Sequence, residues 1–182
     1  MTAAVKAPHI DWAALSPLIA LAGGVCVVLM VGLVRSRFVR RQVVPFLTLV
    51  ALGATAGLSI WQWGRNTEVV SRALSIDDLT LSLTLVFVVA AAATVLLSWR
   101  GSASAEAGEG EFYALLLSSV LGMVVLVAAE NLVAVFLGFE LLSIPLYVLC
   151  ATHMRREHSL ESGLKYLIIG SVGSAKIGRA HV

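Results

Sequence analysis

The chain has 182 residues, of which 59% are hydrophobic and 13% charged, and its formal net charge is +2. These values exclude a water-soluble domain, which covers its surface with polar groups, and so small a charge gives no reason to expect nucleic-acid binding. The apolar residues form continuous blocks, not the alternating pattern of barrel strands. Composition therefore predicts an all-α membrane protein that crosses the lipid bilayer several times.

Five apolar blocks are long enough to span the ~30 Å hydrocarbon core as helices. They predict a multi-pass helical bundle of about five complete transmembrane helices, at residues 12–34, 43–61, 79–99, 112–129 and 132–151. A sixth block, residues 160–174, gives part of another span. In the second block, Gly53 and Gly57 form a small-xxx-small pair, which allows close helix packing.

The polar segments between the blocks indicate the orientation. Residues 65–78 and 101–110 read as polar loops, the second of them flexible. Arginines cluster after the first helix and again after the fifth, and basic loops favour the cytoplasmic side; the residues are Arg35, Arg37, Arg40, Arg41, Arg155 and Arg156. Because the two clusters fall on the same side of the membrane, this orientation places the N-terminus outside.

The sequence has no recognisable redox or metal site. Cys26 and Cys150 lie inside apolar blocks and are interpreted as small buried side chains, not as a disulfide. His153 and His158 flank a basic loop without the further ligands that a metal site requires. Phosphate-binding glycine loops, dinucleotide motifs and iron–sulfur cysteine clusters are missing from the sequence. We therefore expect the chain itself to bind no cofactor and no metal.

Glu140 is the most informative residue, because it lies near the centre of the fifth block. A charge at that depth costs about 2.5–3.5 kcal/mol on insertion scales, and such residues usually serve ion or proton movement. Pro145 follows one turn later and kinks the helix, because it leaves the carbonyl of Leu141 without its usual donor. The alternatives are a neutral, hydrogen-bonded structural acid at Glu140 and a kink that serves packing alone.

Lys165 lies more than one turn inside the sixth block. A lysine beside a membrane carboxylate can exchange a proton with it as their spacing changes. Glu161, however, stands four residues earlier on the same helix face, so the two side chains can also form a simple interfacial ion pair. Composition alone leaves both interpretations open for Lys165.

Several motifs resemble subunit N of bacterial proton-translocating NADH–quinone oxidoreductase, respiratory complex I. They are FLGFELLSIPLY at residues 136–147, SLESGLKY at 159–166, and the shorter strings at 111–116, 121–123 and 131–132. The opening segment, residues 11–17, is similar to the start of that subunit as well. The match is specific between residues 111 and 166 and loose over the first three helices.

The resemblance implies an antiporter-like fold, with three lead-in helices at residues 1–110 and the start of the proton-translocating repeat at 111–176. Glu140 falls on the family's glutamate of the fifth helix, and Lys165 on its lysine of the sixth. It also implies a role in coupling electron transfer from NADH to quinone with proton translocation across the bacterial inner membrane. The other membrane-arm subunits are the expected partners; NADH, FMN, iron–sulfur clusters and quinone belong to the parent complex.

Two rival functions stay open at this stage. One is a stand-alone cation/proton antiporter or a subunit of a membrane-bound hydrogenase, which share the glutamate–proline helix. The other is a non-catalytic membrane scaffold in which Glu140 is structural. Residues 177–182 can be encoded by a common sequencing-library adapter, so we expect a non-native tail there and a reading frame that continues, which would make the chain a fragment.

Overall fold

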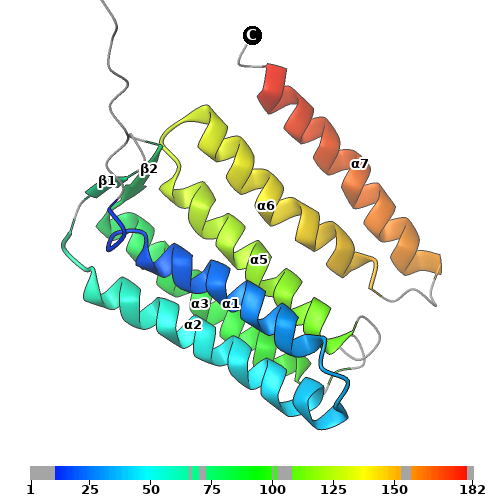
Figure 1. The fold of residues 1–182 in the computed structure, drawn as a ribbon. Helices are drawn as coiled ribbons and strands as arrows, with labels where there is room; N and C mark the ends of the chain where they lie inside the picture. Colours follow the sequence, from blue (N-terminus) through cyan, green and yellow to red (C-terminus); the bar gives the residue numbers. More distant parts are fainter. Residues whose placement is uncertain are drawn as a thin grey trace, which may run out of the picture.

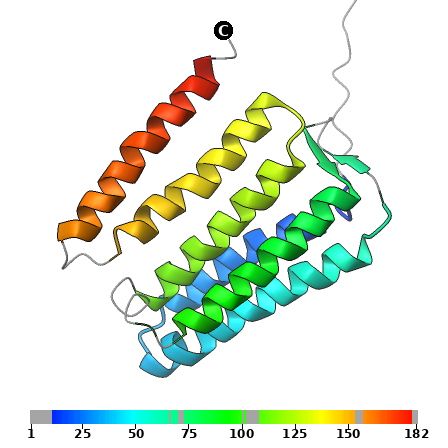
Figure 2. The ribbon, with the colours of Figure 1, turned by 180° about the vertical axis from the view of Figure 1, so that it is seen from behind.

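The computed structural model describes residues 11–65, 67–69, 73–99, 101, 108–152 and 157–179. Within these residues the chain forms a bundle of six α-helices with one small sheet (Figures 1 and 2). In chain order the elements are α1 (Ser16–Gly32), the π-helical turn η1 (Val39–Val43), α2 (Val44–Trp61), β1 (Thr67–Val69), β2 (Leu74–Ile76), α3 (Asp78–Ser98), α5 (Glu109–Ala128), α6 (Leu132–Cys150) and α7 (Glu157–Arg179).

Four helical segments are long and apolar enough to cross a membrane: η1 with α2, then α3, α5 and α6. With 17 residues, α1 is shorter, and at 1.5 Å per residue it extends about 25 Å. In the described part of the chain, α7 is not among these spans, because it carries charged residues near both ends. The prediction of an all-α, multi-pass membrane bundle is confirmed.

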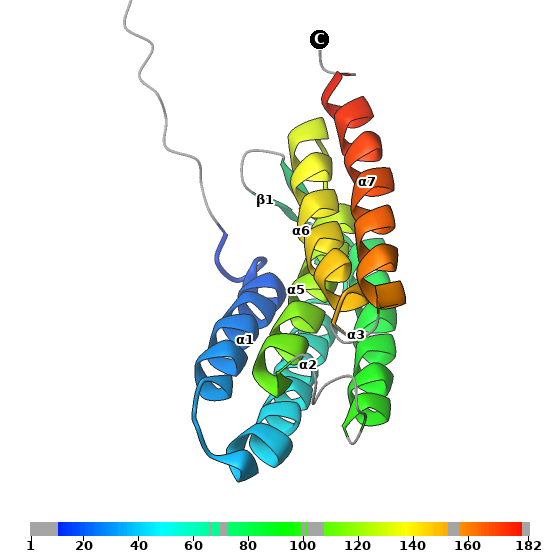
Figure 3. The same cartoon turned by 90° about the vertical axis from the view of Figure 1, so that its right-hand side faces the viewer.

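The helix α5 lies in the middle of the bundle, packed along α1, α3 and α6. Between α1 and α3 lies α2, and α7 lies against α6 at the edge (Figures 1 and 3). The core is aliphatic; fully buried side chains include Leu21, Leu52, Val95, Leu117 and Val124. The outward faces are aliphatic too, with Leu97 85% exposed and Ile169 71% exposed. Exposed apolar surface of this extent fits contact with lipid.

Several polar side chains inside the bundle form hydrogen bonds with the backbone of their own helix. Four hydroxyl groups donate hydrogen bonds of 2.7–2.9 Å to the carbonyl four residues earlier: those of Thr48, Thr55, Ser59 and Thr84. Gln62, only 3% exposed, donates from Nε2 to the Ala13 carbonyl and, at 2.7 Å, to Ser16 Oγ. The side chain of Gln62 therefore ties the end of α2 to the start of α1.

The segment between α2 and α3 contains a β-hairpin where the sequence predicted only a polar loop. The strands β1 and β2 pair antiparallel, and Ile76 on β2 is buried. The hairpin also meets the α5–α6 turn, where the Glu130 N–H donates to the Ala73 carbonyl at 3.0 Å. Strands of three residues carry too little alternation to be recognised in a sequence, so tertiary contacts decide this hairpin.

Close helix packing uses different glycines from the predicted pair. Gly32 of α1 and Gly110 of α5 cross directly, since a Cβ on either would lie 2.5–2.6 Å from the Cα of the other. Around Gly53 and Gly57 a Cβ would meet no atom within 4 Å. Within the described part of the chain, the face that Gly53 and Gly57 leave open to close packing therefore has no neighbouring helix. A small-residue pattern shows that a helix face can be approached, not that a neighbour lies there.

The two cysteines are free and exposed at the surface of the chain. They form no disulfide, as predicted, but the expectation that Cys26 and Cys150 are buried is wrong. A membrane helix is apolar on its lipid-facing side as well as on its packed side. A position inside an apolar block therefore does not establish burial within the protein.

The ends of the helices alternate as the predicted topology requires. The α1–α2 connection, the start of α5 and the end of α6 lie at one end of the bundle, and the β-hairpin and the α5–α6 turn at the other (Figure 1). The basic loop with His153, Arg155 and Arg156 lies outside the described residues. The division at residues 110 and 176 stays a prediction, and so does the non-native tail, of which α7 includes residues 177–179.

Candidate functional site

The candidate site is on α6, whose start is fixed by a side-chain cap. Asn131 has an extended backbone, and its side chain accepts a 2.7 Å hydrogen bond from the Ala134 N–H, which satisfies one of the free donors of the first turn. The helix then continues without a break through the buried Pro145 to Cys150. Proline has no N–H to donate, so the Leu141 carbonyl lacks its usual intrahelical partner.

Glu140 is the ninth of the nineteen residues of α6, midway along the span. Its side chain is half-buried within the chain. Residues three, seven and eleven positions further on share its face of the helix; these are Ser143, Tyr147 and Ala151. Ser143 and Tyr147 are buried, at 5% and 8% exposed. Two polar side chains, Ser143 and Tyr147, therefore follow Glu140 on this face of α6.

The helix α7 covers the far part of this face. The rings of Tyr147 and Tyr166 meet edge to face, with centroids 4.9 Å apart. A Cβ on Gly163 would lie 2.8 Å from that of Ala151, so the two helices are close where α6 ends. Lys165 belongs to this same stretch of α7. Glu140 precedes Tyr147 by seven residues, about 10 Å along the helix axis at 1.5 Å per residue.

Lys165 therefore lies near the end of α6 and not beside Glu140. Its Nζ pairs with Glu161 Oε1 at 2.6 Å, and both side chains are exposed, at 69% and 56%. This is the local pairing that the four-residue spacing allowed. Within the described part of the chain, the carboxylate of Glu140 has no ion-pair or hydrogen-bond partner. The structure does not bring the two predicted site residues together.

Two glycines that the sequence analysis did not single out hold α6 in place. A Cβ on Gly122 of α5 would collide with the backbone of Leu141 and Leu142, directly after Glu140. On α6, a Cβ on Gly138 would lie 2.8 Å from the backbone nitrogen of Leu126. The α5–α6 hairpin is therefore packed backbone to backbone on both sides of Glu140. The signal was present as single glycines in otherwise bulky helices.

This arrangement can support proton exchange inside the membrane. Glu140 has a carboxyl group, a chemical group that can bind and release a proton, and the carbonyl that Pro145 leaves without a donor lies one residue further on. The side chain of His158 is exposed, and its Nδ1 lies 4.0 Å from Oε2 of Glu161. Among the described residues, no three His, Cys, Asp or Glu side chains gather in a way that could hold a metal ion.

Several known proteins are similar to this chain in sequence, and a solved structure is similar to it in fold. Residues 129–177, which contain the whole of α6, match the family described as "NADH:quinone oxidoreductase/Mrp antiporter, TM". NADH-quinone oxidoreductase subunit N 2 of Roseiflexus castenholzii is 37% identical over 164 residues, covering 90% of this chain and 33% of its own length. Subunit N of Desulfitobacterium hafniense is 35% identical over 147 residues, covering 80% and 29%. The chain is similar to these subunit N proteins of NADH-quinone oxidoreductases.

A solved structure shows a similarity in three dimensions as well. A chain of respiratory complex I from Thermus thermophilus with bound aureothin superposes with a TM-score of 0.73 and 29% identity. The superposition covers 87% of this chain and 34% of that one. This chain therefore spans about a third of the length of the subunit N relatives that it matches.

Proposed function

We propose that this chain is part of the membrane arm of a proton-translocating NADH–quinone oxidoreductase, in which it helps to couple electron transfer from NADH to quinone with proton translocation. The observation that carries the proposal is Glu140, an ionisable side chain midway along a membrane-spanning helix. Such residues are costly in the bilayer and are usually kept for ion or proton pathways. The names of the relatives point to the same complex.

In this proposal Glu140 takes up and releases one proton in each cycle. Pro145 leaves a backbone carbonyl beside Glu140 available for water or an incoming side chain. Lys165 serves as a second proton-binding group toward the end of α6, in the stretch of α7 that contacts Tyr147; Tyr147 lies about 10 Å from Glu140 along the axis of α6. Exchange between the two requires either a carrier along the α6–α7 interface or a shift of α7.

The setting of the proposal follows from the same relatives. The other membrane-arm subunits are the partners, and NADH, FMN, iron–sulfur clusters and quinone are held elsewhere in the complex. We place the chain in the bacterial inner membrane with the arginine-rich α1–α2 connection in the cytoplasm, because basic loops favour that side. Its N-terminus then lies outside.

The test is proton pumping by an assembled complex whose subunit N carries this segment. Inverted vesicles supplied with NADH report pumping as quenching of a pH-sensitive dye, while oxidation of NADH is followed in parallel. Glu140→Gln and Glu140→Ala are expected to lower pumping about tenfold or more, since a proton-transfer group contributes at least that much. Lys165→Ala is expected to lower it less, because that side chain is exposed and already paired.

Glu130→Gln is the matched control. It removes the same charge from the same helical hairpin, but Glu130 is exposed at the α5–α6 turn, so pumping should not change. Full pumping in both Glu140 variants would refute the assigned role and favour the scaffold function.

A stand-alone cation/proton antiporter is the second candidate, because the matched family also includes Mrp antiporters. In that case vesicles would acidify or alkalinise in response to an imposed Na⁺ gradient without NADH. Co-purification with NADH-oxidising subunits, and no response to the Na⁺ gradient, would support the respiratory function instead.

A further inference from the structure

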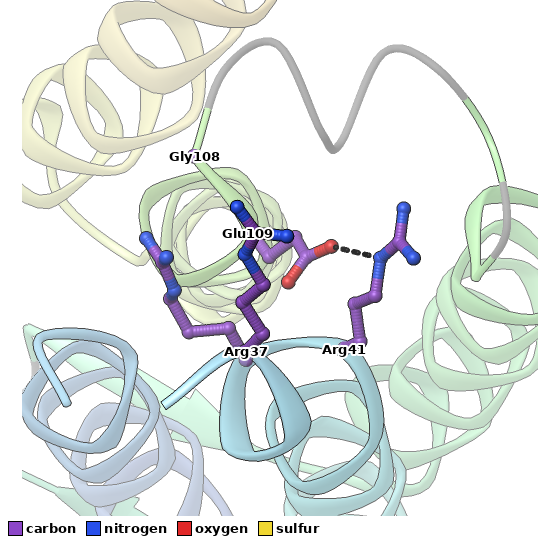
Figure 4. Close-up of a pocket in the computed structure, with 5 residues that line it drawn as sticks. Arg37, Arg41, Gly108 and Glu109 are labelled. Carbon is purple, nitrogen blue, oxygen red and sulfur yellow. Dashed lines mark ion pairs between the residues drawn. The ribbon is translucent and has the colours of Figure 1, made fainter. Parts of the chain in front are cut away.

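A pocket of about 250 Å³ opens between η1 and the first turn of α5 (Figure 4). We call it the arginine pocket; its lining consists of Arg37, Arg40, Arg41, Gly108 and Glu109. The volume is about eight times the ~30 Å³ that one molecule occupies in liquid water. A phosphate group therefore has room inside the arginine pocket.

The lining has three guanidinium groups and one carboxylate. Arg41 Nε pairs with Glu109 Oε1 at 3.5 Å, and the side chain of Glu109 is only 17% exposed. In the described part of the chain, no ion pair engages Arg37 or Arg40. Figure 4 shows arginine side chains on both sides of the Glu109 carboxylate. The arginine pocket thus has excess positive charge, in the forked form that binds phosphate oxygens in pairs.

The packing of α1 and η1 against the start of α5 forms the arginine pocket, so it is not merely a basic loop. Gly108 has a φ of 88°, a conformation that glycine adopts without strain, and the chain turns there into α5. Gly32 and Gly110 bring the end of α1 against the start of α5. In the π-helical turn η1, the N–H of Val44 donates a hydrogen bond to the carbonyl of Val39. Arg40 and Arg41 both belong to this turn.

The location of the arginine pocket points to a lipid. The first span begins at Val39 within η1, so the arginines lie where a membrane-crossing segment meets the aqueous phase. Exposed apolar side chains stand beside them, with Phe38 71% and Leu33 68% exposed. A phospholipid has the complementary arrangement, with acyl chains ending in a charged phosphate, and basic pockets at helix ends suit acidic headgroups.

We propose that the arginine pocket binds the phosphate of an anionic phospholipid, with Arg37 and Arg40 as its principal donors. Arg41 is held in place by Glu109 and adds positive charge at the side. The proposal is independent of proton pumping. A purely topological role for the arginines would require positive charge alone, whereas paired hydrogen bonds to phosphate oxygens require the forked guanidinium groups.

The test measures the lipid retained by the 182-residue chain after extraction from vesicles that contain equal amounts of phosphatidylglycerol and phosphatidylcholine. Native mass spectrometry should find one phosphatidylglycerol per chain, preferred at least tenfold over phosphatidylcholine. The double variant R37Q/R40Q should lower this retention about tenfold or more, since it removes two of the three guanidinium groups that line the pocket.

Three further measurements make the result decisive. Arg35→Gln removes a charge from the same connection, but Arg35 does not line the pocket, so retention should stay within about twofold of that of the parent chain. R37K/R40K keeps the positive charge but lacks the forked guanidinium groups, so retention should fall at least threefold. If R37Q/R40Q loses its helical circular dichroism, the result for R37K/R40K is the one that tests the proposal. Inorganic phosphate at millimolar concentration should not displace the lipid.

Three outcomes would overturn the proposal. One is equal loss of lipid in the Arg35 variant and in R37Q/R40Q, which would indicate surface charge alone. Another is full retention in R37K/R40K. The third is displacement of the lipid by inorganic phosphate, which would make the arginine pocket a site for a free anion.

Discussion

Gly122→Ala is expected to destabilise the chain, because α5 and α6 meet there through their backbones. The new Cβ would lie 2.6 Å from the carbonyl carbon of Leu141 and 2.7 Å from the Cα of Leu142. Carbon atoms pack at about 3.5–4.0 Å, so the helices must separate by roughly an ångström. No side-chain rotamer can relieve the collision, because the atoms struck belong to the backbone.

The magnitude follows from two opposing contributions. Overpacking of this kind costs about 1–3 kcal/mol, and the gain in helix propensity from glycine to alanine offsets at most about 1 kcal/mol. Thermal unfolding in detergent micelles is the assay, and 1 kcal/mol corresponds to roughly 2–4 °C in Tm for a chain of this size. We expect Gly122→Ala to lower the Tm by several degrees.

Gly53→Ala is the matched control in the same assay. Its Cβ would meet no atom within 4 Å, so only the propensity gain applies and the Tm should stay level or rise slightly. Gly138→Ala should behave like Gly122→Ala, since its Cβ would lie 2.8 Å from the nitrogen of Leu126. Equal Tm values for Gly122→Ala and Gly53→Ala would refute the close approach of α5 and α6.

Two further predictions concern the ends of α3 and α2. Asp77→Ala removes the side chain that caps α3 and should cost about 0.5–2 kcal/mol at neutral pH. The hydrogen bond from the Thr80 N–H holds the pKa of Asp77 below its ordinary value, so this stability is present above about pH 4 and is lost as the pH falls through the folded pKa. Unfolding measured from about pH 6 to 2 should therefore show a smaller acid loss in Asp77→Ala than in the parent chain, and parallel curves would contradict the cap. Gln62→Leu abandons two buried hydrogen bonds and should cost about 1–3 kcal/mol, whereas the exposed control Gln42→Leu should stay within about 0.5 kcal/mol; equal losses would refute the tie between α2 and α1.

The sequence was sufficient for the elements that depend on local chemistry. Long apolar blocks define the ends of α2, α3, α5 and α6 to within three residues, because a lipid-exposed backbone must be helical. Glu140 and Pro145 are also visible in the sequence, since an acid and a proline within a continuous apolar run are each costly.

The sequence was not sufficient to predict contacts between residues that are distant in the chain. Lys165 had two possible partners, and the structure places it with Glu161 at 2.6 Å. The β-hairpin exists through its contact with the α5–α6 turn, which is more than 50 residues distant in the chain and leaves no mark on a pattern of three-residue strands.

The sequence by itself thus determined the membrane class of this protein, the order of its helices and the depth of Glu140, because hydrophobicity and chain length specify how a segment crosses a bilayer. Only the tertiary structure decided which glycines are contacts, with Gly122 packed against α6 and Gly53 facing outward. It also decided that Arg41 and Glu109 meet across the arginine pocket. The physical reason is that in a membrane both faces of a helix are apolar, so composition cannot distinguish a face that packs on protein from one that faces lipid.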